Sequence, residues 1–130
     1  MPSPNTLPLF GLTPNIGMIT ISTANTNRDG TGTIGTVLTA GINGTRVDRI
    51  EIIAIGNTTN NIVRLFIDNG SVKKLEKEVL VPLTTPGTTV LTFMSTVSYP
   101  NGLVIPSGFF VDASTNNAES YNIIALGADY

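Results

Sequence analysis

The acidic side chains are the residues of this chain that could most readily do chemistry, because the sequence contains no His and no Cys. Two carboxyl groups at a suitable separation can act as a general acid and a general base. Most of the Asp and Glu residues, however, have a structural explanation. Asp29 and Asp68 lie in sequences typical of turns, and Asp48 and Glu51 each follow an arginine by two residues, which predicts ion pairs. We therefore expect no catalytic carboxyl pair.

Asp112 is the acidic residue that this explanation leaves out, because it lies within the otherwise apolar segment 109–115. A buried carboxylate needs a partner, and we expect this partner to be an arginine. The alternative is a Ca²⁺ ion, which takes oxygen ligands, but no acidic residues near Asp112 have the spacing of a calcium loop. The sequence thus predicts no metal site and no cofactor.

Nucleophilic catalysis and phosphate binding also lack their usual residues. The glycine-bearing segment 29–35 (DGTGTIG) has neither the Lys-Ser/Thr ending of a phosphate loop nor a predicted helix after it. A serine or threonine nucleophile needs an activating base, and without His this base would be a lysine or a carboxylate. Lys73, Lys74 and Lys77 lie together on a charged segment that we expect to be exposed. We expect the chain not to be an enzyme.

Aromatic side chains could instead form a sugar-binding surface, although the chain has no Trp. Tyr99, Phe109 and Phe110 are the candidates. Because Phe109 and Phe110 are adjacent, one of the two rings must point away from the core of a regular strand. Burial of this ring against another subunit is the interpretation that we favour, and glycan binding is the alternative.

The composition favours a protein partner over nucleic acid or membrane. The chain has 130 residues, the size of a single domain, and only 12% of them are charged, about half the usual share. A net charge of −2 predicts no attraction to nucleic acid or acidic lipid, and no apolar run approaches the ~20 residues of a membrane span. Such a weakly charged surface is either held in an assembly or kept soluble by hydroxyl and amide groups.

The elements that carry these residues are predicted to be short strands. Runs of β-branched and aromatic residues alternate with turn signals roughly every eight to twelve residues, which is typical of an all-β, antiparallel β-sandwich. A jelly roll is the form that we expect. The charged segment 72–81 contains residues that favour helix, but it follows a tight turn and ends in apolar residues, so we expect a strand. The expected strands are 18–23, 33–40, 45–55, 61–68, 72–81, 89–99, 103–105, 109–115 and 121–126.

Residues 45–70 are predicted to form the central hairpin, because two apolar runs flank the polar loop 57–60. The first run is apolar on both faces near its end: Ile53 and Ile55 alternate with the even-numbered apolar residues before them. In the second run Phe66 breaks the alternation. A strand that is apolar on both faces is covered on both, so we expect its second face to lie under another sheet, an arm or another subunit.

Residues 1–16 are predicted to form an extended, proline-rich arm outside the domain of residues 17–130, because their prolines exclude a helix. The arm is too apolar for a solvated tail. It either packs on its own domain or docks on a neighbouring subunit or partner. The candidate residues for contacts with a partner or a second copy are Leu7, Leu9, Phe10, Leu12, Ile53, Ile55, Phe66 and Phe110.

Four segments together resemble the small virion proteins of tailed bacteriophages, and the resemblance covers about residues 17–130. They are 19–41 (ITISTANTNRDGTGTIGTVLTAG), 44–56 (GTRVDRIEIIAIG), 62–70 (IVRLFIDNG) and 105–130 (IPSGFFVDASTNNAESYNIIALGADY). The segments are characteristic as a set, and none of them carries a chemical signature. The resemblance implies a β-sandwich or jelly-roll protein on the outside of a phage particle.

The resemblance also implies a role. Proteins of this kind commonly form trimers that decorate or cement a capsid shell, so we expect a structural protein of the capsid surface whose partners are its own copies and the major capsid protein. Similar domains occur in head fibres and in tail-associated adhesins. The alternative is therefore a receptor-binding or glycan-binding module of a head fibre or a tail.

Overall fold

The computed structural model describes residues 13–130, which form strands, turns and loops and contain no helix. No helix of this described part is therefore long and apolar enough to cross a membrane. The strands are β1 (Thr13–Ile21), β2 (Gly35–Thr39), β3 (Thr45–Ala54), β4 (Asn61–Asp68), β5 (Lys73–Val81), β6 (Met94–Ile105), β7 (Phe110–Thr115) and β8 (Tyr121–Asp129). They form two four-stranded antiparallel sheets, so the predicted all-β sandwich is confirmed.

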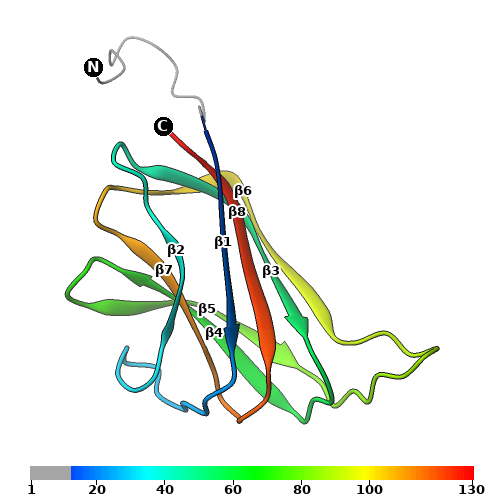
Figure 1. Cartoon of the computed structure of the whole chain (residues 1–130). Coiled ribbons are helices and arrows are strands. Elements are labelled where there is room, and N and C mark those ends of the chain that lie inside the picture. Colours follow the sequence, from blue (N-terminus) through cyan, green and yellow to red (C-terminus); the bar gives the residue numbers. More distant parts are fainter. Residues whose placement is uncertain (1–12) are drawn as a thin grey trace.

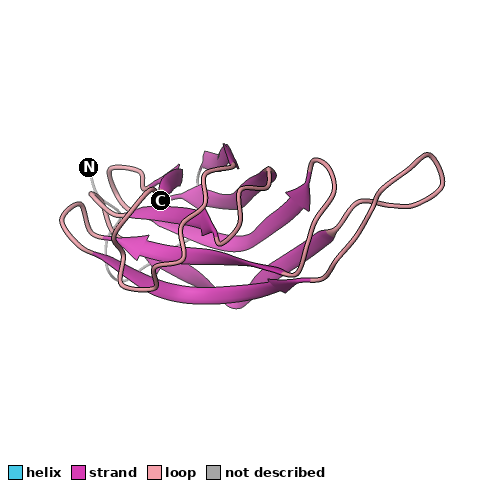
Figure 2. Ribbon diagram, turned by 90° about the horizontal axis from the view of Figure 1, so that it is seen from below, coloured by secondary structure: helices cyan, strands magenta, loops and turns pink. Residues whose placement is uncertain are grey.

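The two sheets lie face to face and enclose the core (Figure 1), and Figure 2 shows the layers from below. Their strand orders are β1-β8-β3-β6 and β2-β7-β4-β5. Alternate side chains of each strand point inward: Ile50 and Ile52 of β3, Val63 and Leu65 of β4, and Ile123 of β8 are all buried in the core. Each such side chain contributes about 1.5–3 kcal/mol through burial.

The strand order pairs the ends of the chain with each other. The first strand pairs with the last, β2 with β7, β3 with β6 and β4 with β5. Every connection changes sheets except the β4–β5 hairpin. The jelly-roll form stays a prediction, and this order supports it.

The predicted central hairpin is wrong, because β3 and β4 lie in different sheets. The loop between them crosses from one layer to the other, and the backbone of Thr58 exchanges hydrogen bonds with the backbone of Thr84. Sheets pack only about 10 Å apart, so a short polar loop can cross between layers as readily as it can turn within one. The tight hairpin instead joins β4 to β5, where Gly70 has a φ of 93°.

The first strand begins earlier than we expected. β1 starts at Thr13, so residues 13–16, expected in the arm, belong to the sheet. Pro14 is tolerated there because β1 is an edge strand. The arm residues predicted to contact a partner lie outside the described residues: Leu7, Leu9, Phe10 and Leu12.

The sixth strand joins two segments that we expected to be separated by a turn. Residues 100–102 (PNG) lie within β6, and the register between β3 and β6 shifts between Val47 and Arg49. Gly102 has a φ of 75°, so the expected turn signal is a bulge that the strand accommodates. Residues 89–93, expected in the same strand, precede it.

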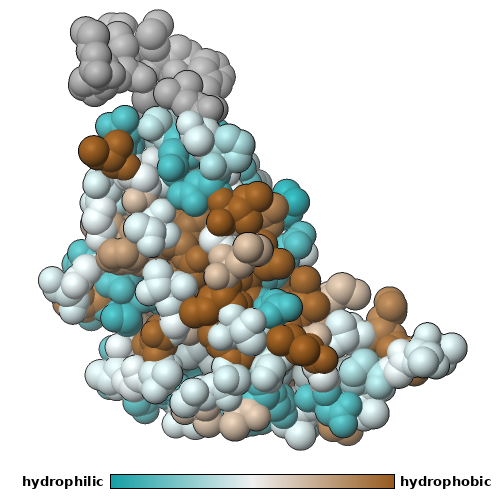
Figure 3. Space-filling model, viewed as in Figure 1, coloured by the Kyte–Doolittle hydropathy of each residue, from teal (hydrophilic) through white to brown (hydrophobic). Residues whose placement is uncertain are grey.

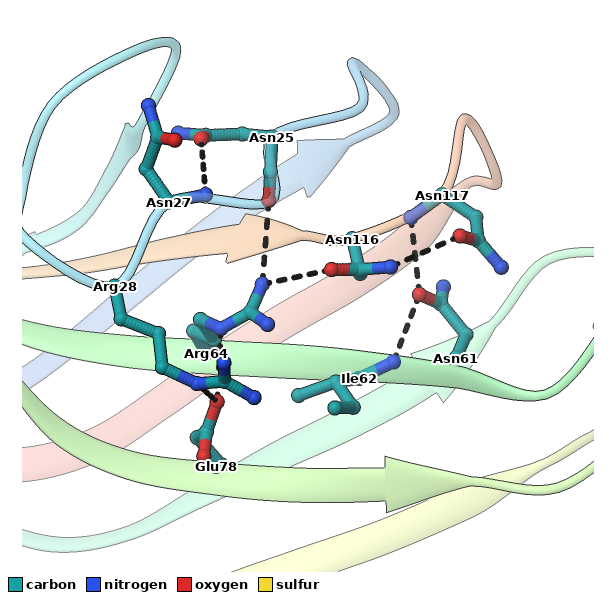
Figure 4. Close-up of polar contacts among 9 residues, drawn as sticks. All are labelled: Asn25, Asn27, Arg28, Asn61, Ile62, Arg64, Glu78, Asn116 and Asn117. Atoms are coloured by element: carbon teal, nitrogen blue, oxygen red, sulfur yellow. Dashed lines mark hydrogen bonds and ion pairs between the residues drawn. The ribbon is translucent and has the colours of Figure 1, made fainter.

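The outer face of the β2-β7-β4-β5 sheet lies under the chain's own β1–β2 loop (Figure 4). Arg64 of β4 donates a hydrogen bond from Nη1 to the carbonyl oxygen of Asn25 at 3.2 Å. Arg28 of the loop lies 2.6 Å from the carboxylate of Glu78 in β5. Phe66, on the same face as Arg64, is completely buried. The prediction that Phe66 contacts a partner is therefore wrong, because a loop of its own chain covers this face.

Candidate interaction surface

The outer face of the β1-β8-β3-β6 sheet carries apolar side chains in contact with solvent. Met18 and Ile16 of β1 are 72% and 55% exposed, and Met94 of β6 is 54% exposed. Half-buried apolar side chains lie between them on the two central strands. We call this set the apolar face: Ile16, Met18, Ile53, Met94, Ile124 and Leu126.

The strand registers place these side chains next to one another. Met18 is paired with Ile124, and Ile16 is paired with Leu126, across the β1–β8 ladder. Ile53 is paired with Met94 across the β3–β6 ladder. Figure 3 shows apolar atoms gathered over β1 and β8. Single exposed apolar residues are ordinary on a protein surface, but a continuous group of them marks an interaction surface.

Charged residues of β3 lie on the same face and form pairs with each other. Arg46 Nε lies 2.9 Å from Asp48, and Arg49 Nε lies 3.4 Å from Glu51. The predicted ion pairs are thus confirmed. Exposed pairs of this kind add little stability, but they leave the apolar face without an excess of either charge.

The predicted contact residues do not lie on one surface. Ile53 belongs to the apolar face, and Ile55, which follows β3, is 55% exposed. Phe110 is half-buried and lies on the opposite sheet. The two isoleucines and Phe110 therefore cannot meet the same flat partner surface.

Several residues of the apolar face were missed by sequence reasoning. Ile16 was assigned to the arm, and Met18 was seen only as part of a first strand. The signal that could have found Ile124 and Leu126 is the run Ile123–Leu126, in which both alternating sets are apolar. One set enters the core and the other emerges on the outer face, as for Ile123 and Ile124.

The candidate aromatic residues do not form a common platform. Tyr99 and Phe109 are partly buried and pack against the core. Tyr99 belongs to β6 of one sheet, whereas Phe110 begins β7 of the other. Stacking of a sugar needs exposed rings held together, and this arrangement does not favour it.

Asp112 lies beside a second carboxyl group rather than beside an arginine. It is completely buried, and neither carboxylate oxygen has a hydrogen-bond partner within residues 13–130. Burial, followed by the neighbouring carboxyl of Asp68, raises the pKa of Asp112 to about 7. The Nζ of Lys73 lies 3.4 Å from Asp68, while Arg64 pairs with Glu78. The expected arginine partner is therefore wrong.

This carboxyl pair does not form a metal centre of the usual kind. In the described part of the chain, no three side chains of His, Cys, Asp or Glu gather in a way that could hold a metal ion. The ammonium group of Lys73 already lies against Asp68, where a cation would have to bind. The local arrangement is instead that of two neighbouring acids, of which Asp112 takes up a proton at a higher pH than Asp68 does.

Comparison with known proteins identifies no family. No protein-family model matches the chain, and no curated protein matches its sequence. Among solved structures, the chain is similar to a chain of the cyanophage Pam1 capsid asymmetric unit, with 15% sequence identity and a TM-score of 0.38 over 98% of this chain and 94% of that one. A likeness this weak supports no inference about the fold or the function.

Proposed function

We propose that this chain is a structural subunit of a phage virion, which associates with copies of itself and with the capsid through protein surfaces. The resemblance of residues 17–130 to small virion proteins of tailed phages supports the proposal, as does the all-β sandwich. The observation that carries it is the apolar face, because an isolated subunit leaves Met18 and Ile16 in water. Burial of apolar surface is favourable by roughly 25 cal/mol per Å².

The specific role that we propose is that of a decoration or cement protein on the outer capsid surface. In this role copies of the chain form a trimer, as the resemblance implies, with the closed cyclic symmetry usual for identical subunits, and the trimer binds the major capsid protein. A protein that binds the assembled shell and not its separated parts stabilises the shell by mass action. This mechanism needs no active site, only surface that is buried on assembly.

Self-association of purified protein tests the proposal. We expect the sedimentation coefficient to increase with protein concentration, and we expect Met18→Asp to abolish the increase because it places a charge on the apolar face. Leu80→Asp is the matched control: Leu80 is 75% exposed, close to the 72% of Met18, but lies on the other sheet. The proposal is contradicted if the wild-type protein is a monomer at all concentrations, or if Met18→Asp and Leu80→Asp reduce self-association equally.

Binding to capsids tests the specific role. We expect the wild-type protein to co-sediment with capsids that lack their decoration and to raise the temperature at which they rupture. Met18→Asp, which opposes self-association, should reduce both effects. If the wild-type protein binds to capsids and their rupture temperature does not change, the chain does not act as a cement protein, although it still associates with the capsid.

A further inference from the structure

The free edge of β1 differs from the other sheet edges. Edge strands invite pairing with other chains, and proteins usually protect them with charges, bulges or short length. β5 has charged side chains and a register shift, β2 has five residues and a shift, and the register of β6 also shifts. β1 lacks them: its nine residues carry no charge and pair with β8 in unbroken register, and only Pro14, near its start, opposes pairing along the edge.

Backbone hydrogen bonds establish which residues of β1 face this edge. Ile55 donates its N–H to the carbonyl oxygen of Ser120 at 3.0 Å, so even-numbered residues of β8 face β3 and odd-numbered ones face β1. The β1–β8 ladder pairs odd with odd, as in Gly17 with Ala125. The odd-numbered residues of β1 therefore bond to β8, and the even-numbered residues face the free edge.

The residues that face the free edge are Pro14, Ile16, Met18 and Thr20. Pro14 has no N–H, so its position on this side leaves the ladder to β8 intact. Ile16, Met18 and Thr20 are exposed, and within residues 13–130 their backbone N–H groups have no backbone partner. This edge therefore offers three donors and the matching carbonyl groups to an added strand.

Residues 1–12 have the sequence of a strand that can pair without loss along one edge only. Pro2, Pro4 and Pro8 are all even-numbered, so an extended strand would lack three backbone donors on the even-numbered side and would keep every donor on the odd-numbered side. In an antiparallel pair the odd-numbered residues would lie opposite Ile16 and Met18, with their side chains on the same face. Leu7 and Leu9 would then extend the apolar face.

We propose that residues 1–12 of a neighbouring copy add as an antiparallel strand to the free edge of β1. The inference rests on the proposed function, because it names the partner of the apolar face. Twelve extended residues reach about 40 Å, longer than the nine residues of β1. A chain's own residues 1–12 fit this edge less well. Since β1 is paired with β8 from Thr13 onward, the chain would have to turn back on itself just before β1, and this turn would contain Phe10 and Leu12.

Disulfide trapping tests which chain supplies the strand, and the natural chain has no Cys to interfere. Leu7→Cys protein is mixed with Ile16→Cys, Met18→Cys or Thr20→Cys protein and oxidised, which samples three registers. We expect a covalent dimer in at least one mixture, and none with Leu80→Cys, which lies on the other sheet. When one chain carries both cysteines of the reactive pair, we expect the disulfides to form between chains. The proposal is overturned if the disulfides form within a chain, or if the yield of covalent dimer is no higher than with Leu80→Cys.

A proline scan separates the backbone from the side chain. Met18→Pro removes an edge donor without touching the ladder to β8, whereas Met18→Ala removes the side chain and keeps the donor. We expect the dissociation constant of the self-association to be at least tenfold higher for Met18→Pro than for Met18→Ala, with similar melting temperatures for both. Equal dissociation constants overturn strand addition.

Deletion of residues 1–12 distinguishes this proposal from the proposed function. We expect the deletion to weaken self-association at least tenfold. If the full-length chain associates and the deletion does not weaken it, strand addition is wrong while the apolar face remains an interface. If the full-length chain is monomeric at every concentration, both proposals are wrong.

Discussion

Arg64 is the buried charged residue that holds the β1–β2 loop against the outer face of the β2-β7-β4-β5 sheet. It is 1% exposed, its Nε lies 2.9 Å from Glu78, and its Nη1 donates to Asn25 and to Asn116, each at 3.2 Å. One side chain thus joins β4, β5, the β1–β2 loop and the turn after β7. A buried arginine with partners on all sides positions the loop as well as neutralising a carboxylate.

Replacement of Arg64 should therefore cost far more than replacement of the neighbouring arginine. We expect Arg64→Ala to lower the free energy of unfolding by about 2–4 kcal/mol, since it leaves buried acceptors unpaired and removes a packed stem. Arg28 pairs with the same Glu78 but is 58% exposed, so Arg28→Ala should cost below about 1 kcal/mol. Urea denaturation of both variants measures the difference, and similar losses would contradict this account.

Asp112 should make the stability of the protein depend on pH. Burial and Asp68 raise its pKa in the folded state from 3.8 to about 7, so the folded protein binds a proton that the unfolded chain releases. Stability from this group therefore decreases as the pH increases from about 4 to about 7. The pKa of Asp68 is lowered, and its opposite contribution is lost only as the pH falls through its folded-state pKa, below the window in which Asp112 acts.

Asp112→Asn tests this titration, because the amide has nearly the same shape and no charge. We expect the free energy of unfolding of the wild type to be lower at pH 8 than at pH 5.5, and that of the variant to change less. The variant should also be the more stable protein at pH 8. Parallel pH profiles for the two proteins would show that Asp112 does not titrate in this range.

At the scale of elements, the sequence predicted most of the strands but not which strands pair with each other. Alternation and turn residues identified β5 as a strand in spite of its helix-favouring lysines and glutamates, because the run ends in Val79–Val81 and follows a tight turn. The same reasoning joined β3 to β4 in a hairpin. Periodicity describes which face of a strand is apolar, but it contains no information on whether the next strand lies in the same layer.

The candidate surface was recognised only in part for a related reason. The sequence shows that β3 is apolar on both faces near its end and that Phe66 breaks the alternation of β4, and it does not show what covers these side chains. The outer face of β4, which carries Arg64 and Phe66, lies under the β1–β2 loop, which is polar and has the sequence of an ordinary turn. For Ile53 of β3 no described element covers the second face. Tertiary contacts between distant segments decide between these outcomes.

The fit of the β1–β2 loop should depend on Gly30. Its φ is 87°, and a Cβ atom there would lie 2.3 Å from the carbonyl oxygen of Lys73. We expect Gly30→Ala to lower the free energy of unfolding by about 1–3 kcal/mol through strain and displacement of the loop. It should also increase amide exchange in β4 beneath the loop.

Gly87→Ala is the matched control for this experiment. Gly87 has no positive φ, and nothing lies within 4 Å of the Cβ that alanine would add. We expect this variant to unfold and exchange like the wild type. If Gly30→Ala were equally silent, the loop would not be held closely against β5.

At the scale of the whole molecule, the two outer faces of the sandwich differ. One sheet carries a loop of its own chain, fastened by buried polar groups such as Arg64 and Asn25. The other leaves Ile16 and Met18 exposed beside the unprotected edge of β1. A molecule that covers one face and leaves the other open has one side suited to assembly.

Such an assembly should be driven by apolar burial rather than by charge. The net charge is −2 and only 12% of residues are charged, and the arginines beside the apolar face already pair with Asp48 and Glu51. Salt screens interactions between exposed charges, whereas sulfate strengthens the burial of apolar surface. We expect the dissociation constant of the self-association to change less than about threefold between 0.05 and 0.5 M NaCl and to decrease in sodium sulfate, as measured by sedimentation equilibrium. A tenfold weakening by NaCl would mean that charged groups, and not the apolar face, hold the copies together.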